Sequence, residues 1–456
     1  MVPKVCLKIP QPQLSYPVKD NNRGLAEIKR RATKVSPGIL VHTPRQLNEQ
    51  FWPIFTCMHL LVIVFMVTWA TYNNGFTALT FTPSYQTEAE EITLTGPQNI
   101  TSRTPANPWL GQPAEHLIGL GGLFPPCMRQ DYRIDYHYSR GVGDMLFTGE
   151  EKLGCCEMQS VNAAATVTKD RCVLDGAVWR PVRCSKRGLG ENFVAHIIRP
   201  CCTGLDGSCH MTSPQHCWFV GGKFHLHAEH CYQVNCLEHL CYLGNPPTTP
   251  EYQDTPKLPP SYHQWWRFLT TVYIPQGVVD GVIILSLELP FSWTLERKLG
   301  WLRLLLVHMS AGAGGHLMGS LFSKFTSILT GGGPSLAGIL AVHLVHHLEI
   351  WGLRPKLSKY TFCWTLSVLT LAFLGTIPHL SNHANVWGFV VGFLLAMIYI
   401  PFQWVKRICL LRIICLVILI FGFMCSLMFF YEVQPSEPCS LCMYIDCVPY
   451  ISGICD

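Results

Sequence analysis

Apolar runs of about 20 residues recur along this chain, separated by short polar turns and by one long polar stretch. A helix of about 20 apolar residues spans the roughly 30 Å hydrocarbon layer of a membrane. The runs lie near residues 53–73, 268–290, 301–322, 333–353, 360–379, 384–404 and 408–430. The pattern therefore predicts an all-α polytopic membrane protein with seven transmembrane helices.

Composition and charge support a membrane protein and predict its orientation. Of the 456 residues, 49% are hydrophobic and only 14% are charged. Lys and Arg concentrate in cytoplasmic loops. Here they gather in residues 1–50 and in the turns near 297–298, 354–359 and 406–412, and the turn at 378–385 has none. We therefore expect a cytosolic amino terminus and a luminal carboxyl terminus. The net charge of +5 follows this topology and does not indicate nucleic-acid binding.

The positions of the apolar runs and the local composition divide the chain into segments. The residues before the first run are basic and rich in proline, which predicts disorder. No small-residue cleavage site follows the first run, so we interpret it as a retained anchor. A Pro- and Thr-rich stretch at 246–260 predicts a linker before the second run. The expected segments are a short basic disordered cytosolic tail (1–52), a first transmembrane helix (53–73), a cysteine-rich luminal domain (74–262), a six-helix membrane core (263–431) and a cysteine-containing luminal tail (432–456).

Cysteines concentrate in the two segments predicted to be luminal, with twelve of the 22 in 74–262 and four in the tail. Disulfides persist in the secretory lumen and outside the cell, so both segments are predicted to be stapled by disulfides. The candidates are Cys127, Cys155, Cys156, Cys172, Cys184, Cys201, Cys202, Cys209, Cys217, Cys231, Cys236, Cys241, Cys439, Cys442, Cys447 and Cys455. Spacing does not fix the pairing. Because vicinal disulfides are strained, we expect the adjacent cysteines at 155–156 and 201–202 to take separate partners.

Two other features of the cysteine-rich segment carry candidate chemistry. Asn99-Ile100-Thr101 is an N-glycosylation acceptor sequence, which is consistent with a luminal position. A zinc site that uses His225, His227 and His230 competes with the disulfide interpretation, but an oxidising compartment favours disulfides.

Several short motifs in the segment and in the core resemble those of the inactive rhomboid family, the iRhoms. They include Trp109-Leu110-Gly111, Arg199-Pro200-Cys201-Cys202, Gln264-Trp265-Trp266-Arg267 and Leu299-Gly300-Trp301-Leu302-Arg303. The resemblance runs from about residue 50 to the end of the chain. It implies a six-helix rhomboid-like core and an iRhom homology domain at 74–262.

The resemblance also locates the positions at which a rhomboid protease carries its catalytic groups. Such a protease has a serine nucleophile in Gly-x-Ser-Gly-x-x-x-Gly, a histidine base, and a His and an Asn in the second span. Matching the closing glycine to Gly338 places the nucleophile position at Gly333. The base position falls on Asn385, from the match of Asn385-Val386-Trp387-Gly388-Phe389-Val390-Val391-Gly392 to His-x-x-Gly-x-x-x-Gly. The second-span positions fall on Asp280 and Ile284. Because none of the four holds the required residue, we expect no catalytic residue, no cofactor and no metal.

Two alternative interpretations assign chemistry to other residues of the core. An active intramembrane serine protease would use Ser335 as nucleophile and His383 as a displaced base, whereas the structural alternative is a serine bonded back along its own helix. A metal-dependent membrane enzyme or transporter would use His343, His346 and His347 with Glu349 nearby. Polar residues within a membrane more often bond each other inside the helix bundle.

Asp280 lies within an apolar run, where an unpaired charge is costly, so we expect it to be protonated or paired inside the bundle. The candidate partners are His316 and His383, and His316 is the preferred one.

The function that the resemblance implies is binding without cleavage. The chain is expected to be a pseudoprotease that binds single-span membrane clients and controls their trafficking, maturation or degradation. The implied clients are a tumour-necrosis-factor-converting metalloprotease and growth-factor precursors, and a cytosolic FERM-domain adaptor is a further expected partner. The expected location is the endoplasmic reticulum membrane, extending to the Golgi and plasma membrane.

Overall fold

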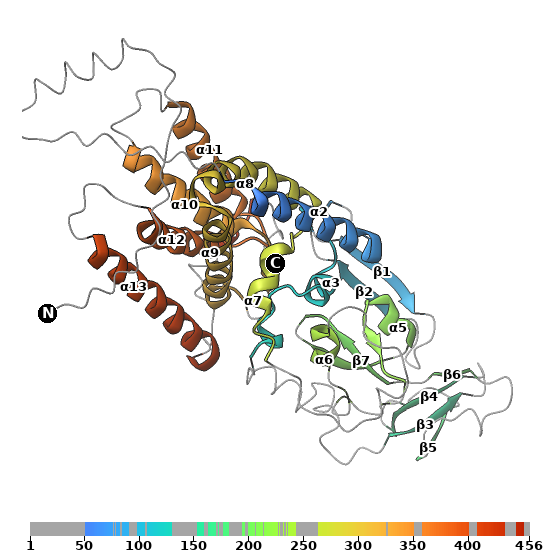
Figure 1. Cartoon of the computed structure of the whole chain (residues 1–456). Coiled ribbons are helices and arrows are strands. Elements are labelled where there is room, and N and C mark those ends of the chain that lie inside the picture. Colours follow the sequence, from blue (N-terminus) through green and yellow to red (C-terminus); the bar gives the residue numbers. More distant parts are fainter. Residues whose placement is uncertain are drawn as a thin grey trace, which may run out of the picture.

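The computed structural model describes residues 51–129, 153–242, 263–350, 358–400, 408–433 and 444–450, with gaps inside the first three ranges. The predicted cytosolic tail up to residue 50 and the predicted linker at 246–260 lie outside the described residues. Figure 1 shows a bundle of long helices at one end of the molecule and a smaller region of short strands and helices at the other.

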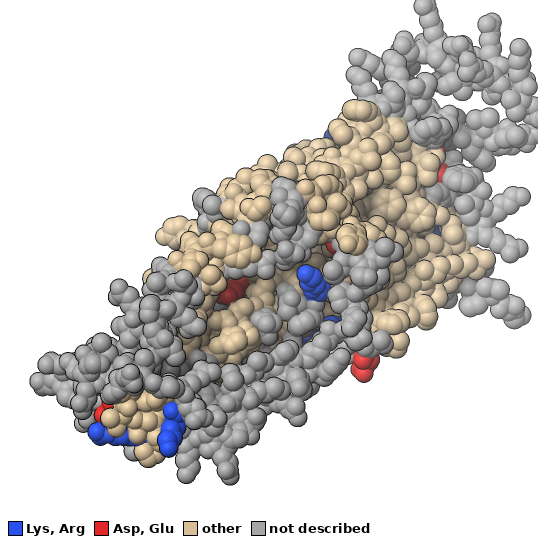
Figure 2. Space-filling view, turned by 180° about the vertical axis from the view of Figure 1, so that it is seen from behind, with Lys and Arg blue, Asp and Glu red and all other residues tan. Residues whose placement is uncertain are grey.

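Each predicted apolar run contains a helix. These helices are α2 (Ile54–Asn74), α8 (Val278–Leu299), α9 (Trp301–Phe322), α10 (Gly333–Ile350), α11 (Ser358–Leu374), α12 (Asn382–Tyr399) and α13 (Ile408–Met428), followed by the π-helical turn η8 (Phe429–Val433). Within the described residues, four of them are long and apolar enough to cross a membrane: α2, α8, α12 and α13. The exact number of seven spans stays a prediction. Figure 2 shows few charged side chains on the described surface of this bundle.

The start of α8 differs from the sequence prediction. The second run was expected to begin near residue 268, but residues 267–273 form the short helix α7 (Arg267–Thr270) and the 3₁₀ turn η6 (Thr271–Tyr273). Ile274 then has an extended backbone, with φ −105° and ψ 103°. The residue before a proline avoids the helical region, and Pro275 follows directly. The membrane helix therefore begins only at Val278.

Helices α9, α10 and α12 pack closely through glycines. A Cβ atom on Gly388 of α12 would collide with the backbone of Pro334, and one on Gly392 would collide with the backbone of Gly338. Small residues allow helix backbones to approach in a membrane, where the hydrophobic effect does not drive helices together. The glycines thus set the contact between α10 and α12.

Helix α2 packs on the other helices through its amino-terminal end (Figure 1). The first amide groups of a helix have no partner inside the helix. The Glu296 carboxylate of α8 accepts hydrogen bonds from the Phe55 amide at 2.7 Å and from the Thr56 amide at 2.9 Å. A carboxylate at a helix amino terminus also interacts favourably with the helix dipole. Residues 240 positions apart therefore fix α2 against α8.

The region between α2 and α7 contains three small sheets, which the all-α prediction did not anticipate. The first pairs β1 (Ser84–Glu90) with β2 (Gln98–Thr104). The second has the order β5-β3-β4-β6 and consists of β3 (Leu153–Met158), β4 (Ala163–Thr168), β5 (Ala177–Arg180) and β6 (Val194–His196), with β6 parallel to β4. The third has the order β8-β7-β9, from β7 (Arg199–Thr203), β8 (Ser208–Thr212) and β9 (Lys223–Phe224). Short helices α3 (Ala114–Gly119), η1 (Pro125–Cys127), α5 (Pro214–Phe219) and α6 (Cys236–Cys241) accompany them.

Disulfides connect these short elements, because none of the strands is long enough to form a large core of its own. The pairs are Cys127–Cys241, Cys156–Cys172, Cys201–Cys217, Cys202–Cys236 and Cys209–Cys231. The adjacent cysteines 201 and 202 take different partners. Cys155 and Cys447 are also disulfide-bonded, and so is Cys409, which was not among the candidates. Cys184, Cys439, Cys442 and Cys455 lie outside the described residues.

The strand-containing region docks on the helix bundle through backbone contacts. Leu123 forms an antiparallel bridge with Leu329, which precedes α10. The first amides of α8 donate to the region: Val278 N to Leu110 O at 3.2 Å and Val279 N to Trp109 O at 3.1 Å. The docked backbone therefore supplies acceptors for the otherwise unpaired start of α8.

Candidate functional site

The positions matched to rhomboid catalytic groups lie together in the fold. Ile284 of α8, Gly333 at the start of α10 and Asn385 of α12 line one small pocket, with His316 of α9. A Cβ atom on Gly333 would lie 2.7 Å from Asn385 Oδ1. The position matched to the nucleophile is therefore directly beside the position matched to the base. At this contact the fold has a glycine without a side chain and a neutral amide, and neither group supplies a nucleophile or a proton acceptor.

The pocket also contains two buried polar atoms, one from His316, which was the preferred partner expected for Asp280, and one from Thr330, which the sequence did not indicate. His316 Nδ1 and Thr330 Oγ1 have no hydrogen-bond partner among the described residues, so no hydrogen bond joins them. Nε2 of His316 instead donates to Gly331 O at 2.9 Å. A hydroxyl nucleophile and its histidine base normally share a hydrogen bond. Thr330 and His316 share none, so they do not form such a pair.

Asp280 is buried, but the partners expected for it were wrong. Its Oδ2 accepts a hydrogen bond from the Gln276 amide at 3.0 Å. His316 bonds to Gly331, and His383 pairs with Asp446. The late start of α8 explains the difference, because it places Asp280 in the first turn of the helix. A carboxylate there can reach back to a free amide and is favoured by the helix dipole.

Ser335 is fully buried and already has a hydrogen-bond partner. Its Oγ donates to the backbone oxygen of His308 in α9 at 2.8 Å. We expected a bond back along its own helix, and the structure has a bond across to the neighbouring helix instead. Gly312 makes this contact possible, because a Cβ atom there would collide with Ser335 Oγ. The hydroxyl thus joins α9 to α10.

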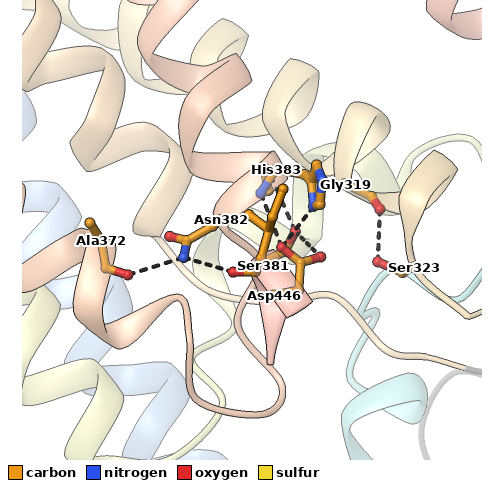
Figure 3. Close-up of polar contacts among 9 residues, drawn as sticks. Gly319, Ser323, Ala372, Ser381, Asn382, His383 and Asp446 are labelled. Carbon is orange, nitrogen blue, oxygen red and sulfur yellow. Dashed lines mark hydrogen bonds and ion pairs between the residues drawn. The ribbon is translucent and has the colours of Figure 1, made fainter. Parts of the chain in front are cut away.

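His383, the proposed displaced base, is paired with a residue near the carboxyl end of the chain (Figure 3). Its Nδ1 lies 2.9 Å from Asp446 Oδ1, and the same oxygen accepts from the His383 amide at 3.1 Å. Asp446 Oδ2 accepts from Ser381 Oγ at 3.0 Å, and the Asn382 side chain donates to Ile445 O at 3.0 Å. Figure 3 shows these contacts grouped at the start of α12. His383 and Ser335 therefore have separate partners and share no hydrogen bond that would form a dyad.

The three histidines of α10 considered as metal ligands also have separate partners. His343 Nε2 donates to Phe291 O at 2.9 Å, and His346 Nε2 lies 2.9 Å from Lys298 Nζ. His347 Nε2 lies 3.3 Å from Thr361 Oγ1. Side chains that diverge to different neighbours do not form a common coordination site. These histidines join α10 to α8 and α11.

Sequence reasoning missed the residue that binds His383 and a cluster of ionisable side chains buried between α2, α8 and α9. Asp446 gave no periodic or motif signal, because it lies in a short segment after the last helix. The cluster consists of His59, Glu288 and His308. Its signal was present, since an ionisable residue inside an apolar run is a candidate for function. The three residues lie in three different runs, so the sequence did not indicate that they meet.

Comparison with known proteins agrees with this geometry. The Rhomboid domain family matches residues 262–402. The chain is 25% identical over 416 residues to inactive rhomboid protein 1 of Callithrix jacchus, covering 79% of this chain and 46% of that protein. It is 27% identical over 346 residues to inactive rhomboid protein 2 of Homo sapiens, covering 65% and 39%. The chain spans about half the length of the curated relatives it matches.

The match to the Rhomboid domain family covers the helix bundle, in which the positions matched to the protease dyad lie together. The curated relatives that the chain resembles over most of its length are inactive rhomboid proteins, which supports an inactive rhomboid protein.

Proposed function

We propose that this protein is a non-catalytic rhomboid pseudoprotease that binds other membrane proteins. The observation that carries the proposal is the contact between Gly333 and Asn385, where a protease needs a nucleophile and a base. Ser335 supports the same conclusion, because its hydroxyl is buried and bonded to a backbone carbonyl. Acyl transfer also needs donors for the developing oxyanion. Asp280 supplies a carboxylate at a position where the resemblance implies a donor.

The full chain in liposomes is therefore expected to leave a single-span rhomboid substrate uncleaved. An active rhomboid protease in the same liposomes serves as the positive control, and product release is measured on gels and by mass spectrometry. Ser335→Ala is expected to match the wild type. Cleavage by the wild type that disappears in Ser335→Ala would establish the serine-protease alternative and end this proposal.

The clients we propose are single-span membrane proteins, as the resemblance to iRhoms implies. The tumour-necrosis-factor-converting metalloprotease and growth-factor precursors are the candidates, with effects on their trafficking, maturation or degradation. Helix α2 supports this kind of client. It packs on the bundle with one face and exposes a row of large apolar side chains on the other, including Leu61, Phe65 and Trp69. The chain passes directly from α2 into the strand-containing region, so a client with one helix and one ectodomain has both surfaces within reach.

A photoreactive amino acid at Phe65 is expected to crosslink to the metalloprotease or to a growth-factor precursor in cell membranes. The control carries the same group at Phe421 of α13, which is similarly exposed, at 68% against 59% for Phe65. Both variants face lipid, so random collisions would label them equally. Equal crosslinking at the two positions, or none at either, would contradict α2 as the client surface.

The location and orientation follow the same proposal. The protein would reside in the endoplasmic reticulum membrane and extend to the Golgi and plasma membrane, with a cytosolic amino terminus and a luminal carboxyl terminus. The five disulfides among the described residues support a luminal position for the region between α2 and α7. The Asn99 sequence lies on strand β2 of the same region and is the proposed glycan site. A FERM-domain adaptor would bind on the cytosolic side.

A further inference from the structure

Three ionisable side chains from three different helices converge in the interior of the bundle. His59 comes from α2, Glu288 from α8 and His308 from α9. They are buried, with exposed fractions of 4%, 0% and 0%. One ligand atom of each side chain lies within 4.8 Å of the ligand atoms of the other two. The cluster is separate from the pocket at Gly333 and Asn385.

The three side chains approach each other without forming ordinary hydrogen bonds. His308 Nδ1 lies 3.0 Å from Glu288 Oε1, and His59 Nε2 lies 3.5 Å from Glu288 Oε2. Neither oxygen of Glu288 has a hydrogen-bond partner among the described residues, and neither ring nitrogen of His308 has one. The short separation from His308 therefore lacks the alignment that a hydrogen bond requires.

These separations match the spacing of ligands around a tetrahedral metal ion. With bonds of about 2.0–2.1 Å to nitrogen and oxygen, neighbouring ligand atoms of a tetrahedral zinc site lie about 3.3 Å apart. The two separations, 3.0 Å from His308 to Oε1 of Glu288 and 3.5 Å from His59 to its Oε2, lie on either side of this value. Two histidines and one glutamate are also a known ligand set for zinc.

The surroundings of the cluster favour a bound cation. An uncompensated carboxylate in a membrane interior is costly, and an imidazole neutralises it only in its protonated form. No Lys or Arg is paired with Glu288 among the described residues, where its two ion-pair partners are these histidines. Phe55 stacks on His59 at a centroid distance of 5.7 Å, and Tyr273 lies 5.8 Å from His308. Such aromatic walls hold ligands in place and limit access of water.

We propose that His59, Glu288 and His308 bind a zinc ion that fastens α2 to α8 and α9. His59 Nε2, one oxygen of Glu288 and His308 Nδ1 would be the protein ligands, leaving the fourth position to a small ligand such as water. Ser335 supports the site indirectly, because its bond to the His308 carbonyl fixes the α9 backbone at the ligand. The proposal is independent of the proposed client binding.

The test is the metal content of the full chain, purified in nanodiscs through a tag without histidine. After removal of metal by a chelator, the protein is incubated with zinc, desalted and measured by inductively coupled plasma mass spectrometry. We expect about one zinc per chain for the wild type and a roughly tenfold or greater loss for His59→Gln and for Glu288→Gln, because each removes a ligand from a three-ligand site. His343→Gln is the control, since it removes a partly buried histidine elsewhere in the bundle and should retain the zinc.

X-ray absorption at the zinc edge keeps the test decisive if a variant does not fold. The wild-type spectrum is expected to show nitrogen and oxygen ligands near 2.0–2.1 Å, with scattering from two imidazole rings. A wild type without stoichiometric zinc would overturn the proposal. Zinc retained in a folded His59→Gln, zinc lost equally from His343→Gln, or a spectrum without imidazole would also overturn it.

Discussion

Replacing Arg267 with alanine is expected to lower the free energy of unfolding by about 3–5 kcal/mol, because it leaves several buried carbonyl groups unpaired. Arg267 is fully buried where the strand-containing region meets the bundle. Its guanidinium donates to Ile118 O at 2.7 Å, to Gly122 O at 2.8 Å and to Cys241 O at 3.1 Å. Burial lowers the pKa of Arg267 to about 10, so the side chain is still charged at neutral pH.

The lost stability is measured by thermal unfolding of the full chain in detergent, together with arrival at the cell surface. Arg180→Ala is the control, because the Arg180 side chain is 60% exposed and its ion pair with Glu157 is expected to contribute less than about 1 kcal/mol. Arg267→Lys should also destabilise, since an ammonium group cannot reproduce the planar arrangement of donors. If Arg267→Ala unfolded at the same temperature as Arg180→Ala, the guanidinium would not join the two regions.

Removing the Cys127–Cys241 disulfide is expected to cost about 4–5 kcal/mol, because it closes a long loop and so restricts the unfolded chain strongly. Its cysteines are 114 positions apart and are 1% and 6% exposed. The bond also fixes Cys241, whose carbonyl accepts from Arg267. The matched comparison is Cys156–Cys172, whose cysteines are 16 positions apart and for which the same relation gives about 3 kcal/mol.

The two double variants, Cys127→Ser/Cys241→Ser and Cys156→Ser/Cys172→Ser, are compared by thermal unfolding without reductant. The first should unfold at the lower temperature and lose protection of the amides around Arg267 in hydrogen exchange. The second should leave those amides protected, since its disulfide lies in the sheet of β3, β4 and β5. Equal losses in both variants would show that loop length does not govern stability here.

Sequence patterns located the helices better than the strands. An apolar run of about 20 residues is a strong signal, because hydropathy adds up over the whole run. The strands of the strand-containing region are two to seven residues long, and their pairing depends on disulfides and on neighbouring strands. Helix α8 was misplaced at both ends, since the run near 268–290 was expected and the helix spans Val278–Leu299. Its start is late because Ile274 and Pro275 interrupt a stretch that is continuously apolar by hydropathy alone.

The candidate site was predictable in residue type but not in contacts. The glycine-rich motif indicated Gly333, a second motif at residues 385–392 indicated Asn385, and the fold places the two side by side. The expected partners of Asp280 were wrong, because a carboxylate in the first turn of a helix finds backbone donors locally. The binding of His383 by Asp446 was not predictable, since 63 residues separate them and no periodicity relates them.

The sequence by itself determined that this is a cysteine-rich membrane protein, with a glycine and an asparagine at the positions matched to the rhomboid dyad. These properties depend on residue identity and on local sums of hydropathy, so they can be read along the chain. Only the tertiary structure decided that Ser335 bonds to His308, that Glu296 caps α2 and that His59, Glu288 and His308 meet. Each of these contacts joins different helices, and helix packing brings such residues together through surfaces that no single segment defines.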